Sequence, residues 1–82
     1  MNHIKVLFFA TLRDKAGIRQ IELDLPQGMN IQQLKEMLSD QNPALKETLG
    51  HCLTAVNHNY QVNEAEIPDD AEVAFFPPVS GG

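Results

Sequence analysis

The spacing of hydrophobic residues changes abruptly near Gly28, and this change restricts the fold more than any other feature of the chain. Before it, in QIELDLPQG, three large apolar residues alternate with polar ones, as in a half-buried β-strand; they are Ile21, Leu23 and Leu25. Pro26 and Gly28 then end the strand. After it, apolar residues recur at intervals of three and four, the period of an amphipathic helix. The chain must therefore combine strands with a helix.

The helix is expected to begin after Asn30 and to stop before Pro43, which cannot continue a helix. Asn30 suits the N-cap, and Gln33 follows three residues later, as in a capping box. The apolar stripe consists of Ile31, Leu34 and Leu38, with Met37 beside it.

Further segments have strand or turn character. Residues 4–10 and 72–76 are apolar runs of strand length, and residues 52–56 indicate a third strand whose buried face the pattern leaves open. A short edge strand is expected at 60–62, a short helical turn at 44–50, and a turn at 14–17. The asparagine-rich stretch NHNY, residues 57–60, is a further turn candidate because asparagine tolerates positive φ.

The resulting fold class is α+β, a mixed sheet of four to five strands with one main helix on one face. One helix of about three turns cannot cover both faces of such a sheet. The face under the helix is expected to carry Ile4, Val6, Phe8, Ile21, Leu23, Leu25, Val73 and Phe75. The opposite face carries Leu7, Phe9, Ala74 and Phe76, and two uncovered phenylalanines there predict an interaction surface.

Composition limits the class of partner. The 82 residues suffice for one small domain, and eleven acidic against six basic residues give a net charge of −5. No run of lysine or arginine appears, so a nucleic-acid partner is not expected. The single cysteine, Cys52, fits a reducing compartment. Neither a signal peptide nor a membrane span is expected, so we predict a cytoplasmic protein.

The chain closes on VAFFPPVSGG, where strand-forming residues meet two prolines. Pro77 and Pro78 cannot donate backbone hydrogen bonds, so the strand should end before them. Two glycines at the end oppose ordering because glycine loses the most backbone freedom on folding. We therefore expect a domain over residues 1–76 and a flexible tail over 77–82.

Three stretches carry a resemblance to a known family: IKVLFFATLRDKAG, LTAVNHNY and DDAEVAFFPPVSGG. Together they resemble the ubiquitin-like sulfur carriers of the β-grasp fold, and within that family the small subunits of molybdopterin synthase. The resemblance covers essentially the whole chain. It implies that an enzyme resembling ubiquitin-activating enzymes uses ATP to adenylate the Gly82 carboxylate. Sulfur then replaces AMP and leaves a 1-thioglycine at Gly82, which the synthase large subunit uses to sulfurate cyclic pyranopterin monophosphate.

The resemblance also implies roles for other residues. Gly81, Ser80, Val79, Pro78 and Pro77 would thread into the partner. Phe9, Tyr60 and Phe76 match hydrophobic contact positions of the family, and Leu7 joins them from the strand pattern. Apart from the resemblance, the residues leave two interpretations of Arg13 and Lys15 open: they meet an acidic partner surface or substrate phosphate, or they belong to an ordinary exposed turn. The expected synthase is a heterotetramer, and this chain itself is expected to bind no cofactor or metal and to lack a complete active site.

Other residues and functions have competing interpretations. Cys52 is either a small buried hydrophobe or a nucleophile that relays persulfide. His3, His51 and His58 lack metal-ligand spacing, and Asp69, Asp70 and Glu72 fit a solvated loop. Alternative functions are a thiamine-pathway sulfur carrier, a ubiquitin-like protein modifier, and a docking module whose tail is incidental.

Overall fold

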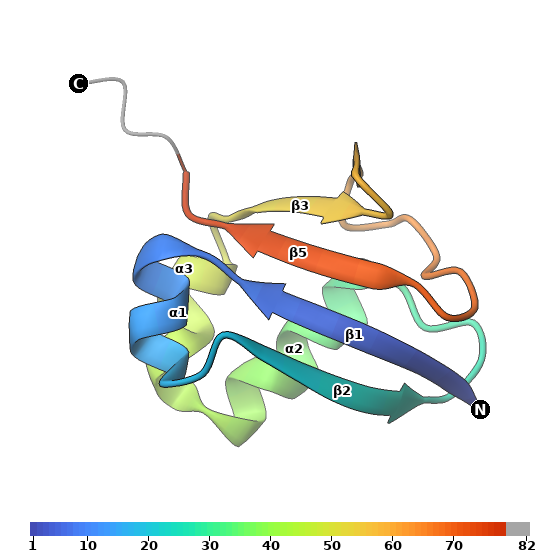
Figure 1. The fold of residues 1–82 in the computed structure, drawn as a ribbon, viewed down its shortest axis with the longest axis horizontal. Helices are drawn as coiled ribbons and strands as arrows, with labels where there is room; N and C mark the ends of the chain where they lie inside the picture. The colour runs from blue at the N-terminus through green and yellow to red at the C-terminus, as the bar shows by residue number, and fades with distance from the viewer. Residues whose placement is uncertain (79–82) are drawn as a thin grey trace.

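The computed structural model describes residues 1–78 (Figure 1). Its sheet has five strands: β1 (Asn2–Phe8), β2 (Gln20–Leu25), β3 (Leu53–Val56), β4 (Asn59–Tyr60) and β5 (Glu72–Phe76). Their order across the sheet is β2-β1-β5-β3-β4. β1 and β5 are parallel neighbours, and the other adjacent pairs are antiparallel. The expected mixed sheet is confirmed, with all its helices on one face (Figure 1).

Helix α2 (Ile31–Gln41) forms where the 3.6-residue period predicts it. Its capping box is complete: the Gln33 N–H donates to Asn30 Oδ1 at 2.8 Å, and the Asn30 N–H donates to Gln33 Oε1 at 2.9 Å. Pro43 opens the 3-10 turn η1 (Pro43–Leu45), which continues into α3 (Lys46–Leu49). The predicted helix and the short turn after it are both confirmed.

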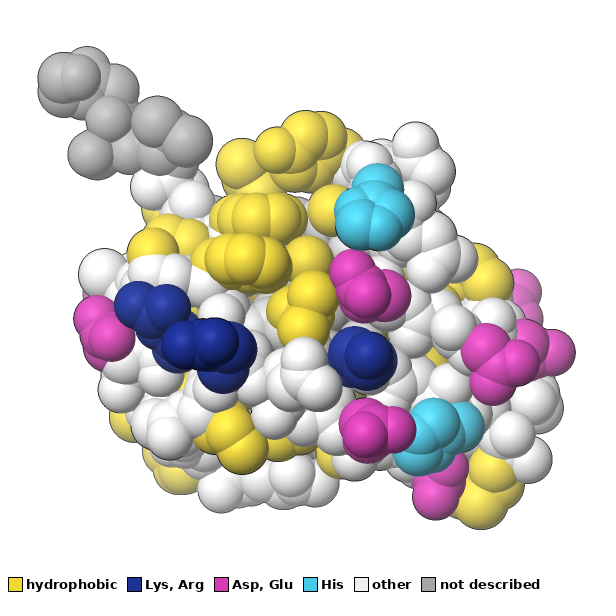
Figure 2. Space-filling view, in the orientation of Figure 1, with side chains coloured by type: hydrophobic (Ala, Val, Ile, Leu, Met, Phe, Trp, Pro, Cys, Tyr) yellow, Lys and Arg dark blue, Asp and Glu magenta, His cyan; other side chains and the backbone are white. Residues whose placement is uncertain are grey.

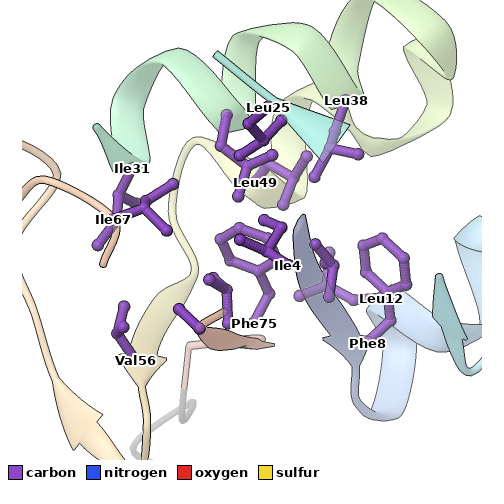
Figure 3. Packing of buried hydrophobic residues seen from close by; sticks show 14 of the residues in the cluster. Ile4, Phe8, Leu12, Leu25, Ile31, Leu38, Leu49, Val56, Ile67 and Phe75 are labelled. Atoms are coloured by element: carbon purple, nitrogen blue, oxygen red, sulfur yellow. The ribbon is translucent and has the colours of Figure 1, made fainter. Parts of the chain in front are cut away.

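The core lies between the sheet and the helices. The inward residues of β1 and β5 are as predicted, and Figure 3 shows Ile4 and Phe75 facing Leu38 and Leu49 from the helical layer. Ile21 and Leu23 are half-buried at the sheet edge. β3 turns Thr54 and Val56 inward, and its register pairs Leu53 with Phe76 and Ala55 with Ala74 on the outer face. The buried face of β3, which the sequence leaves open, is therefore the one that carries Thr54 and Val56.

The prediction of a strand to Ala10 and a turn at 14–17 is wrong. β1 ends at Phe8, and helix α1 (Ala10–Ala16) follows. Ala10 has φ 52°, which is incompatible with an extended strand. Leu12 is fully buried, whereas most of α1 is exposed, so the sequence contains no apolar period that would reveal this helix. Gly17, at φ 73°, ends α1 by donating its N–H to the Arg13 carbonyl.

The β3–β4 hairpin is shorter than predicted. β4 contains only Asn59 and Tyr60, rather than residues 60–62. Asn57 and His58 have φ values of 49° and 71°, as a two-residue hairpin turn requires. The turn predicted in this asparagine-rich stretch is therefore confirmed, and it places Tyr60 opposite Ala55.

Asn2 joins the first strand to the loop before β5. Its Nδ2 donates to the carbonyls of Ile67 and Pro68, and its Oδ1 accepts the N–H of Asp70. We expect Asn2→Ala to lower the free energy of unfolding by about 1–3 kcal/mol, because buried backbone groups lose their partners. Urea denaturation measures this loss. The control Asn59→Ala, at an exposed amide, should cost about 0.5 kcal/mol or less; equal losses in both variants would contradict the prediction.

Candidate functional site

The outer face of the sheet carries a cluster of apolar side chains, here called the aromatic patch: Leu7, Phe9, Leu53, Tyr60 and Phe76. Figure 2 shows hydrophobic side chains gathered on this face. The Phe9 and Phe76 rings are stacked, with centroids 4.6 Å apart and an interplanar angle of 14°. Tyr60 meets Phe76 edge-on at 6.4 Å. These contacts hold three aromatic rings in one surface.

Sheet pairing brings these residues together from distant parts of the chain. The Phe9 N–H donates to the Phe75 carbonyl at 3.2 Å, which places Phe9 beside the end of β5. The small residues Ala55 and Ala74 lie between the larger ones and leave a hollow of about 220 Å³. Phe9 remains 40% exposed and Tyr60 73% exposed. Such a surface is typical of a protein contact.

Sequence patterns identify only part of the aromatic patch. Leu7, Phe9, Tyr60 and Phe76 are predicted, whereas Leu53 is missed. Leu53 is 44% exposed and pairs with Phe76, and only the register of β3 against β5 reveals this position. A four-residue strand contains too few alternations to assign its faces.

The predicted tail begins beside the aromatic patch. β5 ends at Phe76, and Pro77 and Pro78 follow directly, as predicted. The residues predicted to thread into a partner and to carry sulfur, Val79, Ser80, Gly81 and Gly82, lie outside the described residues. Their roles stay predictions.

Arg13 lies in the last turn of α1 rather than in a turn, and it is exposed. It borders a hollow together with Phe9 and Arg19. Lys15 instead directs its ammonium to Thr48 Oγ1, at 2.9 Å. Arg13 and Lys15 are two positions apart in the sequence, but their side chains have different surroundings in the structure.

His3 lies between two carboxylates on the outer face. Its Nε2 is 2.7 Å from Glu22 Oε1, and its Nδ1 is 2.7 Å from Asp24 Oδ1. The hydrogen bonds to Glu22 and to Asp24 raise the pKa of His3 above its ordinary 6.5, and the His3 contact lowers the pKa of Glu22. Imidazolium is favoured because it donates from both nitrogens.

We expect the ring of His3 to titrate above pH 6.5 in an NMR pH series. Because the pKa is raised by folding, the stabilising contribution is complete below the unfolded value and is lost as pH rises through the folded value. The variant Glu22→Gln/Asp24→Asn should move the midpoint back toward the ordinary value. An unchanged midpoint in that variant would show that the carboxylates do not act on His3.

Cys52 lies just before β3 and is half-buried. Its Sγ is 3.4 Å from the Leu49 carbonyl oxygen, to which the thiol can donate. Burial raises the pKa of this thiol, although the Lys35 ammonium acts in the opposite direction. A thiol that stays protonated is a poor nucleophile. The geometry favours the interpretation of Cys52 as a packing residue.

The remaining polar candidates are surface residues. His51 and His58 are exposed, as are Asp69 and Asp70, and Glu72 is half-exposed. Across residues 1–78, no three His, Cys, Asp or Glu side chains lie close enough together to hold a metal ion. Nor does this part of the chain contain a helix long and apolar enough to cross a membrane.

The mixed sheet has the order β2-β1-β5-β3-β4, packs on one main helix, and exposes the aromatic patch where β5 ends. These features define a ubiquitin-like β-grasp protein. The model of the ThiS family matches residues 6–82, and the chain belongs to this family.

Two curated relatives are named molybdopterin synthase sulfur carrier subunit. The protein from Chlamydomonas reinhardtii is 38% identical over 82 residues, covering 96% of this chain and 98% of the relative. The protein from Escherichia coli (strain K12) is 39% identical over 83 residues, covering 96% of this chain and 99% of the relative.

Solved structures share the fold. A putative molybdopterin converting factor, subunit 1, from Pyrococcus furiosus has a TM-score of 0.85 and 30% identity, covering 96% of this chain and all of that one. The modifier SAMP1 from Haloferax volcanii has a TM-score of 0.84 and 25% identity, covering 99% of this chain and 100% of that one. A chain in the complex of subunits 1 and 2 of molybdopterin-converting factor from Helicobacter pylori has a TM-score of 0.70 and 23% identity. The match covers 98% of this chain and 99% of that one.

Proposed function

We propose that this chain is the sulfur carrier of a molybdopterin synthase, with sulfur held as a thiocarboxylate on Gly82. The observation that carries the proposal is the position of the aromatic patch beside Pro77, where the tail begins. Relatives from C. reinhardtii and E. coli bear the name of this subunit. A carrier needs such a surface because its tail must enter another protein while its domain stays outside.

The chemistry requires only a carboxylate on this chain. A C-terminal carboxylate has a reference pKa of about 3.5, so it is ionised at neutral pH. It attacks the α-phosphorus of ATP bound by an E1-like adenylyltransferase, and pyrophosphate leaves. Hydrosulfide supplied by a sulfur donor then attacks the acyl carbon, the bond from that carbon to the AMP oxygen breaks, and AMP departs, leaving 1-thioglycine at residue 82. Gly81 and Gly82 lack Cβ atoms, which keeps this carbonyl accessible in a narrow channel.

Transfer requires the domain and the tail to bind together. Six residues, 77–82, reach at most about 20 Å when extended. Ordering a loose tail costs roughly 1–2 kcal/mol per residue in backbone entropy. Burial of a phenylalanine contributes about 1.5–3 kcal/mol, so Phe9, Phe76 and their neighbours can offset much of this cost.

The proposed partner is the large subunit of the synthase, with two copies of each subunit in the assembly. The complex of subunits 1 and 2 from H. pylori supports a partner of this kind. Within it, sulfur passes to cyclic pyranopterin monophosphate, and two deliveries build the dithiolene of molybdopterin.

Intact mass of the chain made together with its activating enzyme tests the proposal. The expected result is a mass increase equal to the replacement of one oxygen by sulfur. Fragment spectra must place the change on Gly82, because oxidation elsewhere adds nearly the same mass. An unmodified Gly82 after exposure to ATP, activating enzyme and sulfur donor would contradict the proposal.

A second candidate is a protein modifier joined to lysines through Gly82, which the likeness to the H. volcanii modifier favours. Isopeptide-linked adducts that carry the Gly82 remnant on lysine would support it. The thiamine-pathway carrier stays an alternative, and copurification of the chain with one synthase rather than the other separates the two.

A further inference from the structure

Two arginines that are separate in the sequence border one hollow in the structure. The hollow measures about 390 Å³ and is lined by Leu7, Phe8, Phe9, Arg13, Arg19 and Gln20. The sequence contains no run of basic residues, and the chain carries a net charge of −5. Helix α1, which the sequence does not reveal, places Arg13 at the same hollow as Arg19, the residue just before β2. A local positive surface thus forms on an acidic protein (Figure 2).

These two guanidinium groups have no anionic partner within residues 1–78. Every ion pair in this part of the chain involves a histidine. The nearby ammonium of Lys15 donates to Thr48 instead. Both arginines are exposed and can receive an anion from outside.

The arginine hollow is continuous with the aromatic patch. Leu7 and Phe9 line both this hollow and the one between the aromatic rings. A protein that covers Phe9 therefore lies directly beside the hollow that Arg13 and Arg19 line.

We propose that Arg13 and Arg19 form a cationic anchor that receives carboxylates from an acidic surface of the synthase large subunit. The planar guanidinium group of arginine matches a carboxylate with two parallel hydrogen bonds. A nucleic acid is a poor occupant, because Glu22, Asp24 and Glu72 lie on the same sheet face and repel a polyanion. This inference rests on the proposed function for the identity of the partner and adds the chemistry of the contact.

Association kinetics test the anchor. The variant Arg13→Gln/Arg19→Gln is compared with Lys15→Gln/Lys46→Gln, which changes net charge equally but leaves the hollow unaltered. Stopped-flow or surface-based measurements follow binding to purified large subunit across ionic strengths. Because exposed charges act mainly on encounter, the arginine variant should associate about tenfold more slowly at low salt, with a weaker salt dependence. The lysine variant should change less than about twofold.

Cross-linking identifies the occupant. In Arg13→Lys/Arg19→Lys, a carbodiimide should join residue 13 or 19 to an Asp or Glu of the large subunit, located by mass spectrometry. Equal association rates and salt dependence for the two glutamine variants would overturn the anchor. So would slowed sulfur transfer with unchanged association, because the arginines would then act on substrate. If the unaltered chain fails to bind the large subunit at all, the proposed function itself fails.

Discussion

Deletion of Gly82 is expected to abolish sulfur delivery while leaving the domain folded. The deletion moves the terminal carboxylate one residue back, so the acyl carbon no longer reaches the adenylation site or the pterin. The core consists of residues between Ile4 and Phe75, so the free energy of unfolding should change by about 0.5 kcal/mol or less. Reconstituted synthase, supplied with ATP, activating enzyme and cyclic pyranopterin monophosphate, provides the measurement.

A conservative change in the same tail serves as the control. Ser80→Thr keeps the length of the tail and its carboxylate, and it should retain most of the activity. If the chain lacking Gly82 sulfurates the pterin at the rate of the unaltered chain, the tail has no role in sulfur transfer. The chain would then be a docking module.

Phe9→Ala is expected to weaken binding to the large subunit by about ten- to one-hundredfold. Burial of a phenylalanine in an interface contributes about 1.5–3 kcal/mol, and each 1.4 kcal/mol corresponds to about a tenfold change in Kd. Phe9 also stacks on Phe76, so the variant removes a preformed part of the docking surface. Equilibrium titration by calorimetry measures the change in Kd.

The matched control is Ile18→Ala, because Ile18 is 48% exposed and lines neither hollow. Its Kd should change less than about twofold. Urea denaturation verifies that Phe9→Ala still folds, with a loss of about 0.5–1.5 kcal/mol from the aromatic pair. Equal affinities for the two variants would mean that the partner binds elsewhere.

Local patterns correctly predict most strands and the main helix. β2 and α2 follow from their hydrophobic periods, and the Asn30–Gln33 capping box closes as expected. β5 ends before Pro77 because proline cannot donate to a ladder. Helix α1 is not predicted, because most of its residues are exposed and Leu12 alone is fully buried. Such a helix forms through tertiary contacts rather than through its own period.

The sequence by itself determined most of the strands and the main helix, and which outward phenylalanines remain available for contact. Those properties depend on residues a few positions apart. Tertiary structure alone decided that Leu53 joins Phe76, and that Arg13 and Arg19 border one hollow. Strand register and helix placement join distant segments, and they are set by how the whole core packs rather than by any local pattern.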